Sequence, residues 1–179
     1  MVDKPGWPTP RFPPEMEALA RSAVESSLQK AVENMAARPR TVSSAACGGD
    51  ILFLEACRRL GLECYVVLPF APDAFIKGSV EGPKTGRWVQ RFWEQWNGTP
   101  PNHREVLSDV SDPDGPYAAC NRHIVEIARA YGGPVHLIAL WDGAAGDGPG
   151  GTSFLVERVQ ELGGTIDRID ATALLQRVA

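Results

Sequence analysis

Long apolar runs and an excess of positive charge are both missing from this sequence of 179 residues. No apolar run reaches the roughly 18 residues that a helix needs to span a bilayer. The Pro-rich stretch at residues 1–14 lacks the apolar core of a signal peptide. The formal net charge is −4, whereas binding to nucleic acid or to an anionic membrane needs clustered Lys and Arg. We therefore expect a cytoplasmic protein whose main partner is neither nucleic acid nor membrane.

Metal-binding spacings are missing as well. The four cysteines form no CxxC pair and stand in no Cys/His ligand spacing, and the three histidines are scattered. In a reducing compartment such cysteines are ordinarily buried or half-buried free thiols. We therefore expect no structural metal, and free thiols at all four positions: Cys47, Cys57, Cys64 and Cys120.

Segments of strand character alternate with helical segments of 10–15 residues, with no internal repeat and no interior linker. This alternation predicts βαβ units and a mainly parallel sheet. We predict one Rossmann-like, doubly wound α/β domain over residues 1–179, with about five strands and helices on both faces. Two apolar runs are typical of strands buried on both faces, and they lie at 63–69 and 135–141. Residues 70–84 look irregular, and the other strands are expected at 41–45, 104–110 and 165–170.

The chain opens with a loop and an amphipathic helix that begins near Pro13-Pro14. A doubly wound sheet instead usually opens with its central strand. Either this first strand is absent, or the true start of the protein lies upstream.

Two glycine-rich turns, at residues 45–50 and 147–152, each follow an expected strand and open an expected helix. Glycine lets the backbone approach a ligand closely, and a helix start offers unpaired N–H groups with a partial positive charge. Two such turns at one edge of a sheet would form a pocket the size of a phosphate. The sequence therefore indicates a nucleotide-like small molecule as the ligand.

The two turns differ in what they offer to a ligand. No acid caps the helix after the second turn, so its phosphate-binding candidates are Gly150, Gly151 and Thr152, unless this turn merely joins strand to helix. In the first turn an acidic cap would compete with phosphate for the same N–H groups. We expect this turn either to contact the ribose or base, or to act as a plain cap. Its candidates are Gly48, Gly49 and Asp50, with Ser43 and Ser44 at the end of the preceding strand.

Two further pairs of residues are ligand-binding candidates. Tyr117 and Asn121 share a helix face and could contact a base edge or a ribose. Asp142 and Asp147, in the loop after the second apolar run, could recruit Mg²⁺ or bind ribose hydroxyls. Solvated loop acids are the alternative for this pair. Mg²⁺ is the one cofactor that the sequence suggests.

The stretch Thr41–Ile51, with Glu55-Ala56 and residues 65–69 after it, resembles the SLOG superfamily. SLOG domains are Rossmann-like and include the Lonely Guy phosphoribohydrolases, the DNA-processing A proteins and several nucleotide-sensor modules. The turn at 149–152 is similar to the phosphoribohydrolase loop Pro-Gly-Gly-x-Gly-Thr, with one Gly missing. Over nearly the whole chain, the sequence is similar to an uncharacterised bacterial branch that is often appended to larger signalling proteins.

The resemblance also has implications for the order of the strands. In that branch a hydrophobic strand precedes the opening loop. The superfamily layout implies a sheet in which this missing strand separates 41–45 from 135–141. The full implied order is 104–110, 63–69, 41–45, the missing strand, 135–141 and 165–170.

A catalytic acid is implied by the phosphoribohydrolases, which place a Glu in the helix after the glycine loop to act on the glycosidic bond. The corresponding residue here is Glu157. Glu55, one turn past Asp50 on the helix after the first glycine turn, is the second candidate, and solvent or an ion pair with Arg58 or Arg59 is its alternative. The spacing from Thr152 to Glu157 is wider than in that motif, so an exposed helix Glu is the alternative.

Three functions stay open at this point. The first is binding of a nucleotide or nucleotide-derived molecule without turnover, as in a sensor or regulatory module, and we favour it. The second is a phosphoribohydrolase-type N-glycosidase. The third is a homodimeric interaction scaffold with a degenerate pocket, because an aromatic stripe on one helix is typical of a core or a subunit interface. The stripe consists of Trp88, Phe92, Trp93 and Trp96.

Overall fold

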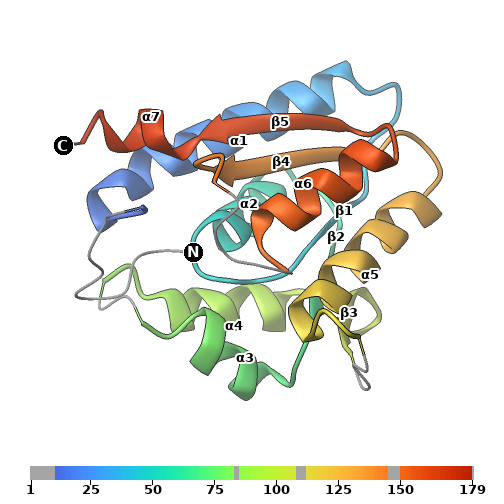
Figure 1. Cartoon of the computed structure of the whole chain (residues 1–179), viewed down its shortest axis with the longest axis horizontal. Coiled ribbons are helices and arrows are strands. Elements are labelled where there is room, and N and C mark those ends of the chain that lie inside the picture. Colours follow the sequence, from blue (N-terminus) through green and yellow to red (C-terminus); the bar gives the residue numbers. More distant parts are fainter. Residues whose placement is uncertain (1–10, 83–84, 108–111, 145–149, 179) are drawn as a thin grey trace.

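The computed structural model describes residues 11–82, 85–107, 112–144 and 150–178. Within them the chain is an α/β protein, as expected (Figure 1). The strands are β1 (Thr41–Ser43), β2 (Cys64–Leu68), β3 (Arg104–Val106), β4 (His136–Trp141) and β5 (Thr165–Asp170). The helices are α1 (Glu17–Asn34), α2 (Gly49–Arg59), α3 (Pro72–Ser79), α4 (Trp88–Gly98), α5 (Pro116–Ala130), α6 (Thr152–Glu161) and α7 (Ala171–Leu175).

The five strands form two parallel sheets, so the prediction of a single five-stranded sheet is wrong. One sheet has the order β1-β2-β3, and the other consists of β4 and β5. Within each sheet the neighbours are those that the SLOG layout implies. The break falls between β1 and β4, where that layout puts the missing strand. The physical reason is that, among the described residues, no strand connects these two edges.

On β1 and β4, the N–H and C=O groups of alternate residues point into this break. In a parallel pair, alternate residues of a strand bond to the same neighbour. The N–H of Thr41 bonds to Glu63 O, and the N–H of Thr165 bonds to Val135 O. It follows that the backbone groups of Val42, on β1, and of Ile138 and Leu140, on β4, point away from their paired strands.

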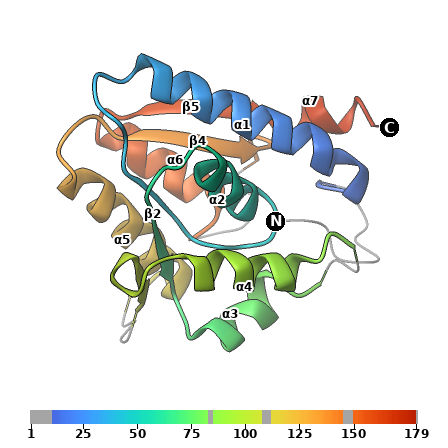
Figure 2. The same ribbon diagram turned by 180° about the vertical axis from the view of Figure 1, so that it is seen from behind.

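Helices cover both faces of the strands, in agreement with the prediction. Helices α1, α2 and α4 lie on one side and α5 and α6 on the other (Figures 1 and 2). The main core forms under the first group and includes Met16, Ile51 and Phe92. A smaller cluster, around Val67 and Cys120, lies under α5.

The apolar run at 135–141 is less buried than its sequence predicts. Only Ala139 of β4 is buried, and the rest of the strand is half-buried. One side of β4 has no neighbouring strand among the described residues, which explains the difference. In β2, which lies between two strands, Val66, Val67 and Leu68 are fully buried.

Part of the segment expected to be irregular is helical. Helix α3 begins with Pro72, whose fixed φ suits the first position of a helix. Its buried face consists of Phe75, Ile76 and Ser79. This helix matters for the site, because Ser79 lies between the two glycine turns.

Candidate functional site

The first glycine turn is built around the start of α2. Its helix cap is Gly48, with a positive φ of 100°, rather than the expected Asp50. Asp50 lies in the first turn of the helix, and its Oδ2 accepts a hydrogen bond from the N–H of Ala46 at 3.1 Å. Burial raises the pKa of Asp50, although the Ala46 N–H partly opposes this. The carboxylate therefore holds the turn closed.

Gly150, the first described residue of the second glycine turn, packs directly against the start of α5, and residues 147–149 of this turn lie outside the described residues. A Cβ added at Gly150 would lie 2.5 Å from Tyr117 Cβ and 2.9 Å from the backbone nitrogen of Ala118. Asn121 Nδ2 donates a hydrogen bond to Gly150 O at 2.8 Å. Gly150 also has a positive φ of 98°. Glycine at this position is thus required for helix packing, whether or not a ligand approaches.

Ser79, which the sequence analysis missed, connects the two turns. Its backbone oxygen accepts from the N–H of Cys47 at 2.9 Å. Its Oγ forms a 2.9 Å hydrogen bond with the hydroxyl of Tyr117, whose Cβ faces Gly150. The start of α2 also lies beside β4, since a Cβ at Gly49 would be 3.7 Å from Leu140 Cβ. The first turn and the described end of the second, residues 150–152, therefore lie at the same carboxyl edge of the strands.

Three helices at this edge have a glycine at the cap position and no capping side chain. The cap positions of α2, α5 and α6 are Gly48, Gly115 and Gly151. In contrast, Asp170 caps α7 by accepting from the N–H groups of Thr172 and Ala173. Uncapped helix starts keep a partial positive charge. Thr152 is the first residue of α6, and Ser43 and Ser44 end β1 at the same edge, all three half-buried.

The ligand-binding candidates Tyr117, Asn121 and Asp142 already have partners within the protein. Tyr117 and Asn121 connect the turns as described above. Asp142 Oδ1 accepts from the N–H of Ala144 at 2.9 Å, and Asp142 Oδ2 lies 3.3 Å from Arg11 Nε. Asp147 lies outside the described residues. Within the described part of the chain, no cluster of three or more Asp, Glu, His or Cys residues could hold a metal ion.

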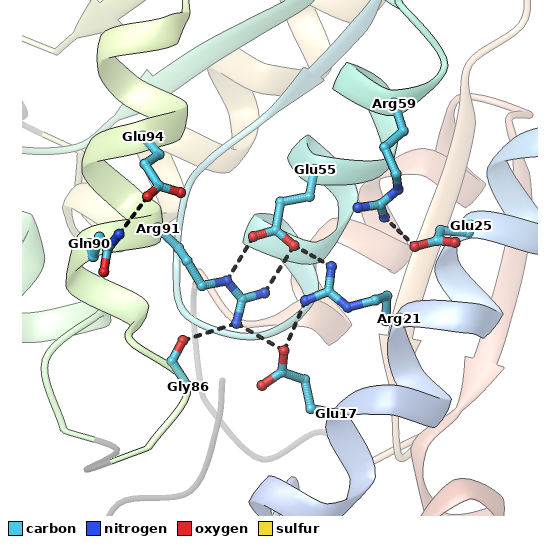
Figure 3. Close-up of polar contacts among 9 residues, drawn as sticks. All are labelled: Glu17, Arg21, Glu25, Glu55, Arg59, Gly86, Gln90, Arg91 and Glu94. Atoms are coloured by element: carbon cyan, nitrogen blue, oxygen red, sulfur yellow. Dashed lines mark hydrogen bonds and ion pairs between the residues drawn. The ribbon is translucent and has the colours of Figure 1, made fainter.

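Glu55 lies in a network of ion pairs on the α1–α2–α4 side (Figure 3). Arg91 bonds to it through two nitrogens, at 2.7 and 3.0 Å, and Arg21 bonds to Glu55 Oε2 at 2.5 Å. Glu17 accepts from both arginines, each at 2.9 Å. Burial alone would raise the pKa of Glu55, but its hydrogen bonds with Arg91 and Arg21 prevail and lower it. A carboxyl held ionised in this way is poorly suited to donate a proton.

The other catalytic candidate, Glu157, is exposed. It lies on α6 beside Val156, which is buried together with Val159 on the inner face of the helix. The side chain of Glu157 thus lies on the outer face of α6, away from its packed side.

The aromatic stripe of α4 is part of the core. Trp88, Phe92 and Trp96 are buried, and Phe92 lies against Phe75 of α3 with ring centroids 6.0 Å apart. Trp93 is half-buried and contacts Phe92 edge-on. Most of this stripe is therefore occupied within the chain itself.

Comparison of the chain with family models, with curated proteins and with solved structures finds no match. The resemblance to SLOG domains accordingly stays a prediction. No described helix, α1 included, combines the length and the apolar character that crossing a bilayer requires.

Proposed function

We propose that the carboxyl edge of the strands binds a nucleotide or nucleotide-derived small molecule, and that the domain serves as a sensor or regulatory module. The observation that supports this most is the set of glycine-capped helix starts at that edge. Backbone N–H groups and the helix dipole together favour an anion at such a position. A phosphate is the anion that the proposal assigns to the start of α6, at Gly151 and Thr152.

In this proposal the first glycine turn contacts the ribose or base of the ligand instead of its phosphate. At the start of α2, Oδ2 of Asp50 already accepts from the N–H of Ala46, so a phosphate would have to compete with this side chain for N–H groups. Ser43 and Ser44 offer hydroxyl groups at the end of β1. Together with the backbone of Gly48 and Gly49, they suit the ribose or base of the same ligand.

Binding without turnover is favoured over N-glycosidase activity. The ion pairs of Glu55 hold it in the ionised form, and Glu157 lies on the outer face of α6. The ionised state of Glu55 and the outward position of Glu157 both argue against a general acid at these residues. A homodimeric scaffold is less favoured as well, since most of the α4 stripe is buried.

A thermal-shift series with AMP, ADP, ADP-ribose and cyclic nucleotides tests the proposal. A ligand at 100 times its Kd should stabilise the protein by about 2.7 kcal/mol. Thr152→Asp should remove this stabilisation, because a fixed carboxylate at the first residue of α6 repels a phosphate. The same acid favours the helix itself, so the unliganded variant should unfold near the wild-type temperature.

Thr152→Asn is the matched control, because Asn has the shape of Asp without its charge. It should keep most of the ligand-induced shift. Equal shifts in the Asp and Asn variants, or no shift with any nucleotide in the wild type, would contradict the proposal. Release of free base from a nucleoside monophosphate, lost in Glu157→Gln, would support the N-glycosidase instead.

A further inference from the structure

A small cavity lies at the opposite edge of the sheet β1-β2-β3 from the candidate site. It has a volume of about 150 Å³ and reaches Thr41 and Cys64, the first residues of β1 and β2. Rings of Tyr65 and Tyr131 and the charged side chain of Arg40 contribute to its wall. Arg40 lies 5.2 Å above the centre of the Tyr131 ring. Of the four free thiols, Cys64 is half-buried and lines this cavity, whereas the other three are buried.

A second thiol, that of Cys57, lies close to Cys64. Cys57 lies in the last turn of α2, and a tight connection, closed by the 2.9 Å bond from Leu62 N–H to Cys57 O, leads into β2. Cys64 lies opposite Thr41 in the register of β1 and β2, and its side chain packs against the core cluster that contains Cys57. The hydroxyl of Thr41 lies 3.5 Å from Cys57 Sγ. Cys57 is thus buried beside two residues that line the cavity, Thr41 and Cys64.

The environment of the pair favours one thiolate. The hydrogen bond from the Cys64 thiol lowers the pKa of Cys57, and that bond, with burial, raises the pKa of Cys64 well above its usual range. Interacting groups of this kind lose their protons as a pair. The Cys57 thiolate can therefore act as a base for the thiol of Cys64, which lines the cavity. By contrast, burial raises the pKa of Cys120 to about 12, as in an inert structural cysteine.

We propose that Cys57 and Cys64 form a redox-active dithiol, which hydrogen peroxide entering the cavity oxidises to an intramolecular disulfide. As the Cys57 thiolate takes the proton of the Cys64 thiol, the sulfur of Cys64 attacks one peroxide oxygen, so that an S–O bond forms and the O–O bond breaks. The departing hydroxide takes up a proton and leaves as water. The sulfur of Cys57 then attacks the sulfenic sulfur and forms the S–S bond, and its thiol proton leaves with the hydroxyl group as a second water. Two thiols are oxidised and one peroxide is reduced to two waters.

Peptide mapping of the full chain tests this proposal. After peroxide treatment the intact protein should lose the mass of two hydrogen atoms, and its titratable thiols should fall from four to two. Trypsin cleaves after Arg58 and Arg59, so the two cysteines end on different peptides. A disulfide between them appears as a linked pair, 41–58 with 60–77, that dithiothreitol separates.

The peptide 41–58 also contains Cys47, so the fragment spectrum must place the bond at Cys57. Cys57→Ser and Cys64→Ser should each abolish the linked pair, whereas Cys120→Ser should leave it in place. The mapping of the unchanged chain decides the question even if a serine variant does not fold. A bond that contains Cys47 or Cys120 would overturn the proposal. Four free thiols, under conditions that fully oxidise glutathione in the same tube, would overturn it as well.

Discussion

At the scale of single residues, Glu55 stands out because its carboxylate accepts hydrogen bonds from two arginines, Arg21 and Arg91. The side chains of Glu55 and Arg91 are only 13% and 10% exposed. Arg91 also lies 3.9 Å above the centre of the Trp88 ring, so its charge sits among apolar groups. A buried ion pair adds little to the stability of the folded state compared with an apolar replacement of both partners. Removing only one partner is strongly destabilising, because the other charge stays buried. The network joins α1, α2 and α4 (Figure 3).

Glu55→Gln should lower the free energy of unfolding by about 3 kcal/mol at neutral pH. Gln keeps the size and one acceptor oxygen, but Arg91 loses its nearest negative charge. Glu25→Gln is the matched control, because Glu25 pairs with Arg59 while both side chains are at least 40% exposed. This control should cost less than about 1 kcal/mol. Urea unfolding of the three proteins measures the difference.

The effect of Glu55→Gln should depend on pH in one direction. The pKa of Glu55 is lowered in the folded protein, so the folded state holds its ionised form more strongly than the unfolded state does. Its contribution is complete above the ordinary Glu pKa of about 4.3 and is lost as the pH falls through the lower folded value. The stability gap between wild type and Glu55→Gln should therefore close below about pH 4. A gap that does not change with pH would contradict this role of the charge.

At the scale of secondary-structure elements, Gly150, in the turn before α6, packs closely against Tyr117 and Ala118 at the start of α5. Gly150→Ala should destabilise the protein by about 2–4 kcal/mol, the sum of a positive-φ penalty and an overlap with Tyr117. Gly163→Ala is the matched control at the other end of α6. Gly163 also has a positive φ, of 68°, but nothing lies within 4 Å of its added Cβ. The control should cost about 1–2 kcal/mol.

Thermal unfolding of the two glycine variants measures this difference. An equal loss in both would mean that α5 moves away from the turn at little cost. The contact would then be too weak to hold the second glycine turn in place, and the candidate site would lose its rigid support.

Most elements could be predicted from the sequence, but few of their contacts could. Helices α2, α5 and α6 follow from apolar spacing bounded by glycine or proline, which are local signals. Helix α3 has only eight residues, too few for its spacing to stand out. The hydrogen bond between Ser79 and Tyr117 joins residues 38 positions apart, and the Arg11–Asp142 ion pair spans most of the chain. Nothing in local spacing specifies such pairs, so the partners of the predicted site residues had to come from the structure.

At the scale of the whole molecule, the division between β1 and β4 is the main departure from a doubly wound fold. The alternation of strands and helices predicts parallel pairing and helices on both faces, and both are confirmed. It does not predict whether neighbouring edges actually join. That depends on whether a strand lies between them, and an apolar run such as 135–141 has the same sequence with or without this neighbour. The half-buried state of β4 therefore depends on how the strands are arranged in the fold and not on the sequence of residues 135–141.

Hydrogen exchange measures the division directly, because the two sides of β4 differ in their hydrogen bonds. The register with β5 directs the N–H groups of Leu137 and Ala139 to that strand. The N–H groups of Ile138 and Leu140 point into the break instead, where no backbone acceptor for them is found in the described part of the chain. Amides without a hydrogen bond exchange through smaller openings. Ile138 and Leu140 should therefore exchange several-fold faster than Leu137 and Ala139. Equal protection along β4, with equal protection at Val42 of β1, would mean that a further strand pairs with both edges in solution, and the two sheets would then be one.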